Sequence, residues 1–148
     1  MIAYNAFLKA CERRGFKGDI HRDIGTRLVN STDNSIYYQY PRAVLQPKDK
    51  DDIQLCLTLA QLDEYREVHI SARGGGTGTN GQSLNTGLIM DSSRHMDKIL
   101  DFDEQTGHLS VQAGVVLDDI NDFLRPYGRF FAPTVAPSDR ATIGGMIS

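Results

Sequence analysis

Residues 68–91 read VHISARGGGTGTNGQSLNTGLIMD, and this stretch decides the fold. Residues 68–72 and the apolar run at 88–90 each have a pattern typical of a strand. The segment between them is rich in glycine and threonine, and the second run begins about seven residues after Gly81, too soon for a crossover helix. We therefore predict that the first strand leads directly into a glycine-rich loop at the carboxyl end of a sheet, where α/β proteins bind their ligands.

The residues before this stretch complete a strand–helix–strand unit. Residues 43–45 form a short apolar run that Pro47 ends. Three aspartates between 49 and 52 favour the start of a helix, and apolar spacing carries that helix to about Arg66 with two buried faces. Strands joined in this way are parallel, with a right-handed crossover. The sheet is therefore expected to be at least partly parallel.

The N-terminal residues give a weaker pattern. Apolar residues from Tyr4 to Cys11 have helical spacing, and Gly15 is placed to end that helix. Residues 18–40 contain several turn-forming residues, so we expect irregular structure there, with a helical turn at 19–24.

Three tyrosines, Tyr37, Tyr38 and Tyr40, lie close together in the sequence. Clustered aromatic residues are more often packing surface than ligand platform, so we assign them no binding role. We assign residues 1–36 to an N-terminal helical extension and residues 37–148 to the main domain.

The residues after the glycine-rich stretch predict a hairpin and a helix. Apolar positions at 99–100 and 109–112 flank a turn at 103–107, which is typical of a hairpin. Residues 117–126 have helical spacing and begin with acidic residues. The tail, residues 130–148, contains two prolines and is expected to be a loop.

Length and charge restrict the class of protein. A chain of 148 residues is one domain or part of a larger protein, and it can bury a core without disulfides or structural metal. It carries 16 Lys and Arg against 19 Asp and Glu, and no basic run exceeds two residues. This balance argues against a nucleic-acid partner.

The chain has two cysteines, Cys11 and Cys56, and both fall on apolar stripes of predicted helices. Two thiols set no metal-ligand spacing, so we interpret them as reduced core residues. No stretch approaches the length of a transmembrane segment, and no signal peptide is evident. We therefore expect a cytoplasmic protein.

The glycine-rich loop matches two phosphate-binding motifs only in part. Residues 76–81 read GTGTNG, a literal G-x-G-x-x-G, but no helix follows to receive a pyrophosphate as in a Rossmann site. The P-loop pattern also nearly fits, but Gln82 stands where its lysine belongs. The remaining interpretation is a loop whose glycines let successive amides converge on one anion. Such a loop suits the internal diphosphate of FAD. The alternative is a glycine-rich surface turn.

Several short motifs follow one another in a specific order along the chain. They are Pro41, Ala43-Val44-Leu45 and Pro47, Arg73-Gly74-Gly75-Gly76-Thr77 with Gly81-Gln82, Leu88 to Asp91, Ala113-Gly114-Val115, and Thr142-Ile143-Gly144-Gly145. From about Tyr37 to Ser148 this set resembles the FAD-binding domain of the vanillyl-alcohol oxidase and p-cresol methylhydroxylase (PCMH) superfamily. Segments 33–37, 73–82 and 92–96 are most similar to bacterial FAD-linked D-2-hydroxyacid dehydrogenases.

The resemblance implies an α+β domain of the PCMH type that contains an α/β subdomain. Its first lobe would hold a small parallel sheet flanked by helices, followed by the start of a second lobe. The resemblance also implies FAD as cofactor, with the glycine loop around the pyrophosphate. The cofactor-binding residues it implies are Arg73, Gly74, Gly75, Gly76, Thr77, Gly78, Asn80, Gly81, Gln82, Pro133, Thr142, Gly144 and Gly145.

The position of Thr77 bears on how the flavin is held. Some relatives attach the flavin covalently through a histidine of this loop, and Thr77 stands at the matching place. Threonine cannot form that bond, so we predict non-covalent FAD. Pro133 and the segment from Thr142 to Gly145 are expected near the ribityl or ring portion.

The resemblance further implies that the intact protein oxidises a small D-2-hydroxy acid by hydride transfer to FAD. The second FAD-binding lobe, the substrate domain and the catalytic residues would lie beyond Ser148, and long relatives carry an iron–sulfur region there. The 148-residue chain is then expected to be inactive alone and to self-associate through surface meant for the missing lobe. The alternative is a non-catalytic nucleotide-binding or assembly module that keeps the fold.

Other chemically capable residues give no site. The four histidines lack the spacing of a metal site, and the aspartates at 118, 119 and 122 fit a solvated helix start. We therefore predict no metal. Arg73 is expected either to contact the anion or to pair with a carboxylate.

Overall fold

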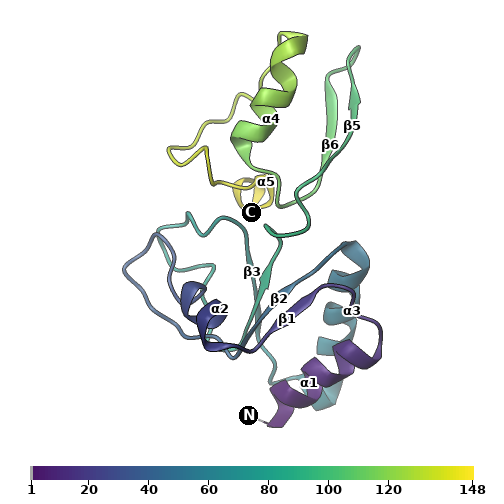
Figure 1. Ribbon diagram of the computed structural model, residues 1–148, viewed down its shortest axis with the longest axis vertical. Helices are drawn as coiled ribbons and strands as arrows, with labels where there is room; N and C mark the ends of the chain where they lie inside the picture. Colours follow the sequence, from purple (N-terminus) through teal and green to yellow (C-terminus); the bar gives the residue numbers. More distant parts are fainter. Residues whose placement is uncertain (1) are drawn as a thin grey trace.

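A four-stranded sheet builds the lower lobe in Figure 1. The computed structural model describes residues 2–148, and in it the strands are β1 (Asp19–His21), β2 (Ala43–Gln46), β3 (Ile70–Arg73) and β4 (Leu88–Asp91), in the order β1-β2-β4-β3. Strands β2, β4 and β3 are parallel, and β1 is an antiparallel edge. The prediction of a partly parallel sheet is therefore confirmed.

Strand β4 lies between β2 and β3, the two strands that the helical crossover connects. Its neighbour β3 runs parallel to it, although no helix joins the two. The glycine-rich segment 74–87 alone makes this crossover, as its length predicted. The loop must therefore run from the carboxyl edge of the sheet, where β3 ends, back to the opposite edge, where β4 begins.

The two faces of the sheet follow the two-residue alternation of its strands. Side chains that point into the main core come from alternate positions of β2 and β4, namely Ala43, Leu45, Leu88 and Met90. Helices α1 (Ile2–Arg13) and α3 (Lys50–Ala60) pack together over this face. Val44 and Ile89 lie at the intervening positions and are also fully buried, so both faces are covered.

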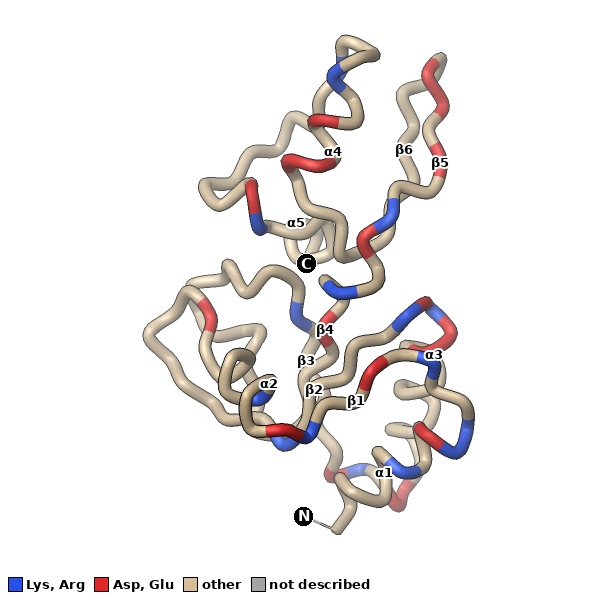
Figure 2. The backbone as a smooth tube through the Cα atoms, in the orientation of Figure 1, with Lys and Arg blue, Asp and Glu red and all other residues tan. Residues whose placement is uncertain are grey.

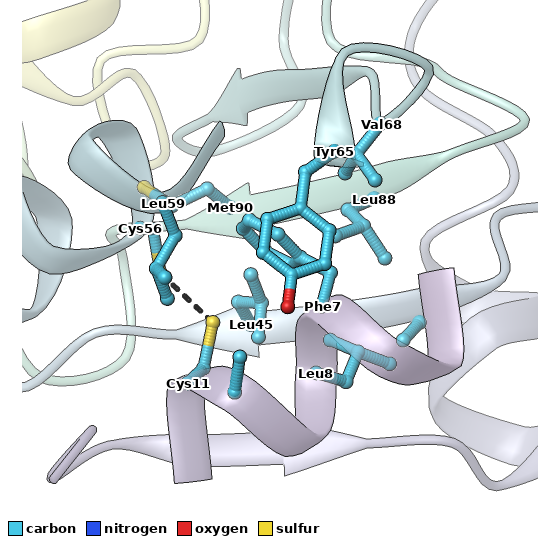
Figure 3. Packing of buried hydrophobic residues seen from close by; sticks show 12 residues of the cluster. Phe7, Leu8, Cys11, Leu45, Cys56, Leu59, Tyr65, Val68, Leu88 and Met90 are labelled. Atoms are coloured by element: carbon cyan, nitrogen blue, oxygen red, sulfur yellow. Dashed lines mark hydrogen bonds between the residues drawn. The ribbon is translucent and has the colours of Figure 1, made fainter. Parts of the chain in front are cut away.

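The main core joins the N-terminal helix to the sheet (Figure 3). The Phe7 ring packs edge to face on Tyr65 of the short helix η1 (Asp63–Tyr65), with centroids 5.4 Å apart. Cys11 and Cys56 are fully buried, with sulfurs 3.9 Å apart, and both are free thiols. The neighbouring Cys11 and burial raise the pKa of the Cys56 thiol well above its ordinary value. The prediction of two reduced core cysteines is confirmed.

The upper lobe contains the predicted hairpin and helix. Strands β5 (Ile99–Asp103) and β6 (His108–Val111) pair antiparallel. Helix α4 (Leu117–Leu124) continues into η2 (Arg125–Tyr127), and the chain reaches the short helix α5 (Ile143–Ile147). A second apolar cluster, centred on Val115, Ile120, Leu124 and Ile143, holds these elements together.

The tail returns to pass along the start of this lobe. Thr142 forms an isolated antiparallel bridge with Val116, and the Ile143 amide donates to the Val115 carbonyl over 2.9 Å. The Gly144 amide donates to the Ala113 carbonyl, also over 2.9 Å. Residues 140–145 therefore lie where the two lobes meet.

The N-terminal region is more ordered than predicted. The expected helical turn at 19–24 is wrong, because 19–21 form β1 and a helix, α2 (Ile24–Val29), follows. Strand β1 exists through its pairing with β2, which the sequence pattern of three residues cannot show. Asp23 caps α2 by accepting a hydrogen bond from the Thr26 amide.

Two further expectations about elements need correction. Helix α3 ends at Ala60 rather than near Arg66. Its predicted apolar faces are buried only in part: Cys56 and Leu59 lie in the core, whereas Leu57 and Leu62 are exposed. The tail, predicted as a loop, ends in α5.

The tyrosine cluster is also placed differently. Tyr37 and Tyr38 are more than half exposed, with 54% and 59% of their surface accessible. Tyr40 has the Arg27 guanidinium 4.3 Å from its ring centroid. The first two are therefore surface residues rather than core residues.

Charges of both signs are distributed along the chain (Figure 2). Basic and acidic segments alternate on the outer elements of both lobes, in keeping with the net charge of −3. Over residues 2–148, no helix has both the length and the apolar character needed to cross a membrane.

Candidate functional site: the glycine loop between the lobes

The glycine loop begins where β3 ends, at Arg73, and leads away from the carboxyl edge of the parallel strands. No helix or strand forms before β4 begins at Leu88. Gly76 and Gly81 have φ values of +65° and +74°, a conformation that other residues rarely adopt. These two positions require glycine for backbone reasons alone.

The main-chain amides of residues 75–79 are the chemical feature of this loop. Across the described residues, none of these N–H groups donates a hydrogen bond to a protein acceptor. The next amide, of Asn80, donates to the Gln82 side-chain oxygen over 3.2 Å. Successive unpaired amides in a loop with positive φ values form a concave donor set that suits an anion. The amides from 75 to 79 are therefore free to bind an anion, and their convergence on one group stays a prediction.

Gly74 and Gly75 serve a different purpose, because they are packed against the tail. A Cβ atom on Gly74 would lie 2.0 Å from the Thr142 hydroxyl oxygen. A Cβ on Gly75 would lie 2.0 Å from the Arg140 carbonyl oxygen. Residues at these positions must be glycine for the two lobes to touch.

Thr142 carries a polar atom that the protein leaves unpaired. Its side chain is 3% exposed, and within the described chain its hydroxyl oxygen has no hydrogen-bond partner. Thr142 occupies the N-cap position of α5 without capping it, and its oxygen faces Gly74 instead. A buried hydroxyl of this kind costs free energy unless a ligand or water meets it. Next to a row of free amides, this donor set fits a diphosphate group.

Arg73 is turned back into the protein. Its guanidinium donates to the Thr32 carbonyl over 2.9 Å and to the Ser83 hydroxyl over 3.3 Å. Burial lowers the pKa of Arg73 from its ordinary value, and the charges of Asp91 and Asp33 oppose that shift. The side chain therefore sits among carboxylates, and direct contact with a cofactor stays a prediction.

The remaining predicted residues are not all brought to the loop. A Cβ on Gly145 would lie 3.6 Å from the Thr142 hydroxyl, so this residue borders the same contact. Gly144 instead packs against Ala113. Pro133 is exposed in the segment before α5, and no hydrogen bond joins it to the loop. A role for Pro133 near the flavin stays a prediction.

Beside Gly74 and Gly75 the surface is hollowed by about 850 Å³. Helix α2, the ends of β2 and β4 and the tail all contribute to its wall. Its charged residues are Asp23, Arg73, Asp91, Arg94 and Arg140.

Two of these arginines were missed by sequence reasoning. Arg94 follows β4, so its place beyond the carboxyl end of a strand next to β3 is a signal that could have found it. Arg140 comes from the tail, and only the approach of its carbonyl to Gly75 brings it here. They place positive charge on the wall of the hollow that Gly74 and Gly75 also line.

Comparison with known proteins agrees with this geometry. The family described as FAD binding domain matches residues 41–148. The chain is 47% identical over 142 residues to D-2-hydroxyglutarate dehydrogenase of Escherichia coli (strain K12), covering 96% of this chain and 14% of the relative. It is 48% identical over 145 residues to the Pseudomonas putida enzyme of the same name, covering 98% of this chain and 14% of the relative.

A solved structure shares the fold. Alkyldihydroxyacetonephosphate synthase superposes with a TM-score of 0.80 at 18% identity, covering 96% of this chain and 28% of the other. The chain thus spans about a seventh of the length of the curated relatives quoted above.

Proposed function

Since the chain belongs to the family of FAD binding domains, we propose that it forms one side of the FAD site of a dehydrogenase that oxidises a small D-2-hydroxy acid. The observation that carries this proposal is the row of unpaired amides at 75–79, beside the orphaned hydroxyl of Thr142. Both are donors placed to meet the oxygens of a diphosphate.

This chain's contribution is binding and orientation. The amides of 75–79 would hold the pyrophosphate, and Arg94 and Arg140 would add positive charge from the rim of the hollow. FAD, when bound, accepts the hydride from the carbon that bears the substrate hydroxyl. Thr77 offers no group for a covalent flavin link, which supports non-covalent binding.

The substrate class comes from the relatives. Two of them carry the name D-2-hydroxyglutarate dehydrogenase at nearly half identity, so D-2-hydroxyglutarate is the substrate we favour. The residues that take the hydroxyl proton would lie outside these 148 residues, and the protein would work in the cytoplasm.

The test uses the protein expressed from its complete reading frame. We expect a yellow protein whose flavin is released into the supernatant by acid precipitation, and which reduces an artificial dye with D-2-hydroxyglutarate but not with the L enantiomer. Flavin that stays with the precipitate would contradict non-covalent binding. A colourless protein that gains no flavin spectrum on incubation with FAD would favour the non-catalytic module.

A further inference from the structure

Residues 31–39, here called the strap, double back on themselves next to the glycine loop. Thr32 and Tyr38 form an antiparallel bridge across its base. At its tip the Asp33 carboxylate accepts a hydrogen bond from the Ser35 amide over 2.9 Å. The strap is therefore a closed turn with its own internal bonds.

The tip of the strap contacts the glycine loop at both of its positive-φ glycines. The Asn34 amide donates to the Gly76 carbonyl over 3.0 Å. The Tyr37 ring lies against Gly81, where a Cβ atom would come within 2.9 Å of ring carbon Cδ2. Each contact engages a glycine in the left-handed region, and glycine is the residue type with the greatest backbone freedom.

Side chains tie the strap to both ends of the loop. Ser83, which is 8% exposed, donates from its hydroxyl to Asp33 Oδ2 over 3.0 Å. The same hydroxyl accepts from Arg73 Nη1, and Arg73 Nη2 donates to the Thr32 carbonyl. Arg73 is the last residue before the loop and Ser83 lies on its return, so one network closes the loop through the strap.

The charge of Asp33 suits this role. Burial raises the pKa of its carboxyl group, but hydrogen bonds from Ser35 and Ser83 and the charge of Arg73 outweigh burial, and the net pKa is lowered. Asp33 is therefore ionised at neutral pH and accepts these bonds as a carboxylate.

The strap lies before residue 41, where the match to the FAD binding domain begins. We propose that the strap, through Asp33, Asn34 and Tyr37, is a positioning element that holds the glycine loop in its cofactor-binding shape. This inference rests on the proposed function. Ordering a flexible loop before the ligand arrives removes an entropic cost from binding, so the strap raises the affinity for FAD.

The test is nuclear magnetic resonance on the 148-residue chain without cofactor. Asp33→Ala removes the carboxylate contacts with the Ser35 amide and the Ser83 hydroxyl. Ser83→Ala removes the bond to Asp33 and the bond from Arg73 but leaves the Ser35–Asp33 turn in place. We expect backbone order parameters of residues 75–82 to fall from about 0.85 toward 0.6 or below in each variant, while those of β2 and β4 stay unchanged. Asp103→Ala is the matched control, because Asp103 also accepts from the amide two residues on, in the distant β5–β6 turn.

The second readout is titration of the same variants with FAD, followed by amide chemical shifts. We expect about tenfold weaker affinity or more for Asp33→Ala and Ser83→Ala, and wild-type affinity for Asp103→Ala. If the order parameters and the FAD affinity stay at wild-type values in both Asp33→Ala and Ser83→Ala, the proposed role of the strap is wrong. An intact wild-type protein, expressed from its complete reading frame, that binds no FAD, while the variants still loosen the loop, would overturn the proposed function and leave the strap as a structural clamp.

Discussion

Thr142 places a hydroxyl where the protein offers it nothing to bind. Its oxygen is buried, faces Gly74 and lacks a partner in the described part of the chain. Thr142→Val keeps the shape and removes the unpaired group, so we expect the free energy of unfolding without cofactor to rise by about 1 kcal/mol. The melting temperature should rise by about 3 °C, measured by circular dichroism.

The matched control is Thr142→Ser, which keeps the hydroxyl and loses the methyl group, and which we expect to be destabilising. If Thr142→Val instead lowers the melting temperature, the hydroxyl has a protein or water partner and the site lacks its orphaned donor. With FAD present, the stabilisation by cofactor should be smaller in Thr142→Val than in wild type.

Gly75 tests the contact between lobes. A Cβ there would collide with the Arg140 carbonyl, a backbone atom that cannot move alone. We expect Gly75→Ala to lower the free energy of unfolding by about 1–3 kcal/mol in urea titrations. Gly25→Ala is the control, since Gly25 lies in α2 with its nearest contact at 3.4 Å, and it should be neutral or stabilising. Equal changes in unfolding free energy for Gly75→Ala and Gly25→Ala would mean that the close contact at Gly75 does not hold the two lobes together.

At the scale of elements, Asp49 begins α3. Its carboxylate accepts from the Asp51 and Asp52 amides and pairs with Lys17 at 2.7 Å. We expect Asp49→Ala to cost about 0.5–2 kcal/mol of unfolding free energy at pH 7, from the lost cap. Lys17→Gln should cost less, because a half-exposed ion pair contributes little.

Acid should reduce the difference in stability between wild type and Asp49→Ala. The hydrogen bond from Lys17 lowers the pKa of Asp49 below its ordinary value. A carboxylate with a lowered pKa stabilises the fold above about pH 4 and loses that effect as pH falls through its folded pKa. The gap in stability between wild type and Asp49→Ala should therefore shrink below pH 4 in thermal melts. A gap that stays constant to pH 2 would contradict this.

The sequence predicted elements better than contacts. Spacing alone revealed α1, α4 and the β5–β6 hairpin, because each carries a local apolar pattern. Strand β1 was missed because three residues have no period and exist only by pairing with β2. In the site, the glycine run was readable, whereas Arg140 was not, since only the folded tail brings it beside Gly75. The strap was hidden for the same reason.

For the whole molecule, the limited donor set predicts weak binding by this chain alone. Four hydrogen bonds from the free amides of 75–79 to a charged diphosphate would give about 6–12 kcal/mol, while association costs about 4–15 kcal/mol. We therefore expect titration calorimetry of the 148-residue chain with FAD to give a dissociation constant weaker than micromolar. A submicromolar value would mean that this part of the protein is a sufficient site.

Exposed apolar side chains predict self-association. Ile36, Ile147 and Val29 are 95%, 78% and 73% exposed, and each is large. We expect the sedimentation coefficient of the 148-residue chain to rise with concentration in analytical ultracentrifugation. A coefficient independent of concentration into the millimolar range would contradict this.

The placement of β4 has a consequence for how the protein is made. Strand β4, which lies between β2 and β3, is synthesised after both of them. The edges of β2 and β3 that pair with β4 therefore stay unpaired until β4 has left the ribosome. The glycine-rich segment 74–87 connects β3 to β4 and so determines how β4 inserts between the two strands. Insertion of β4 therefore completes the sheet and closes the glycine loop together, and a chain interrupted before β4 would have neither.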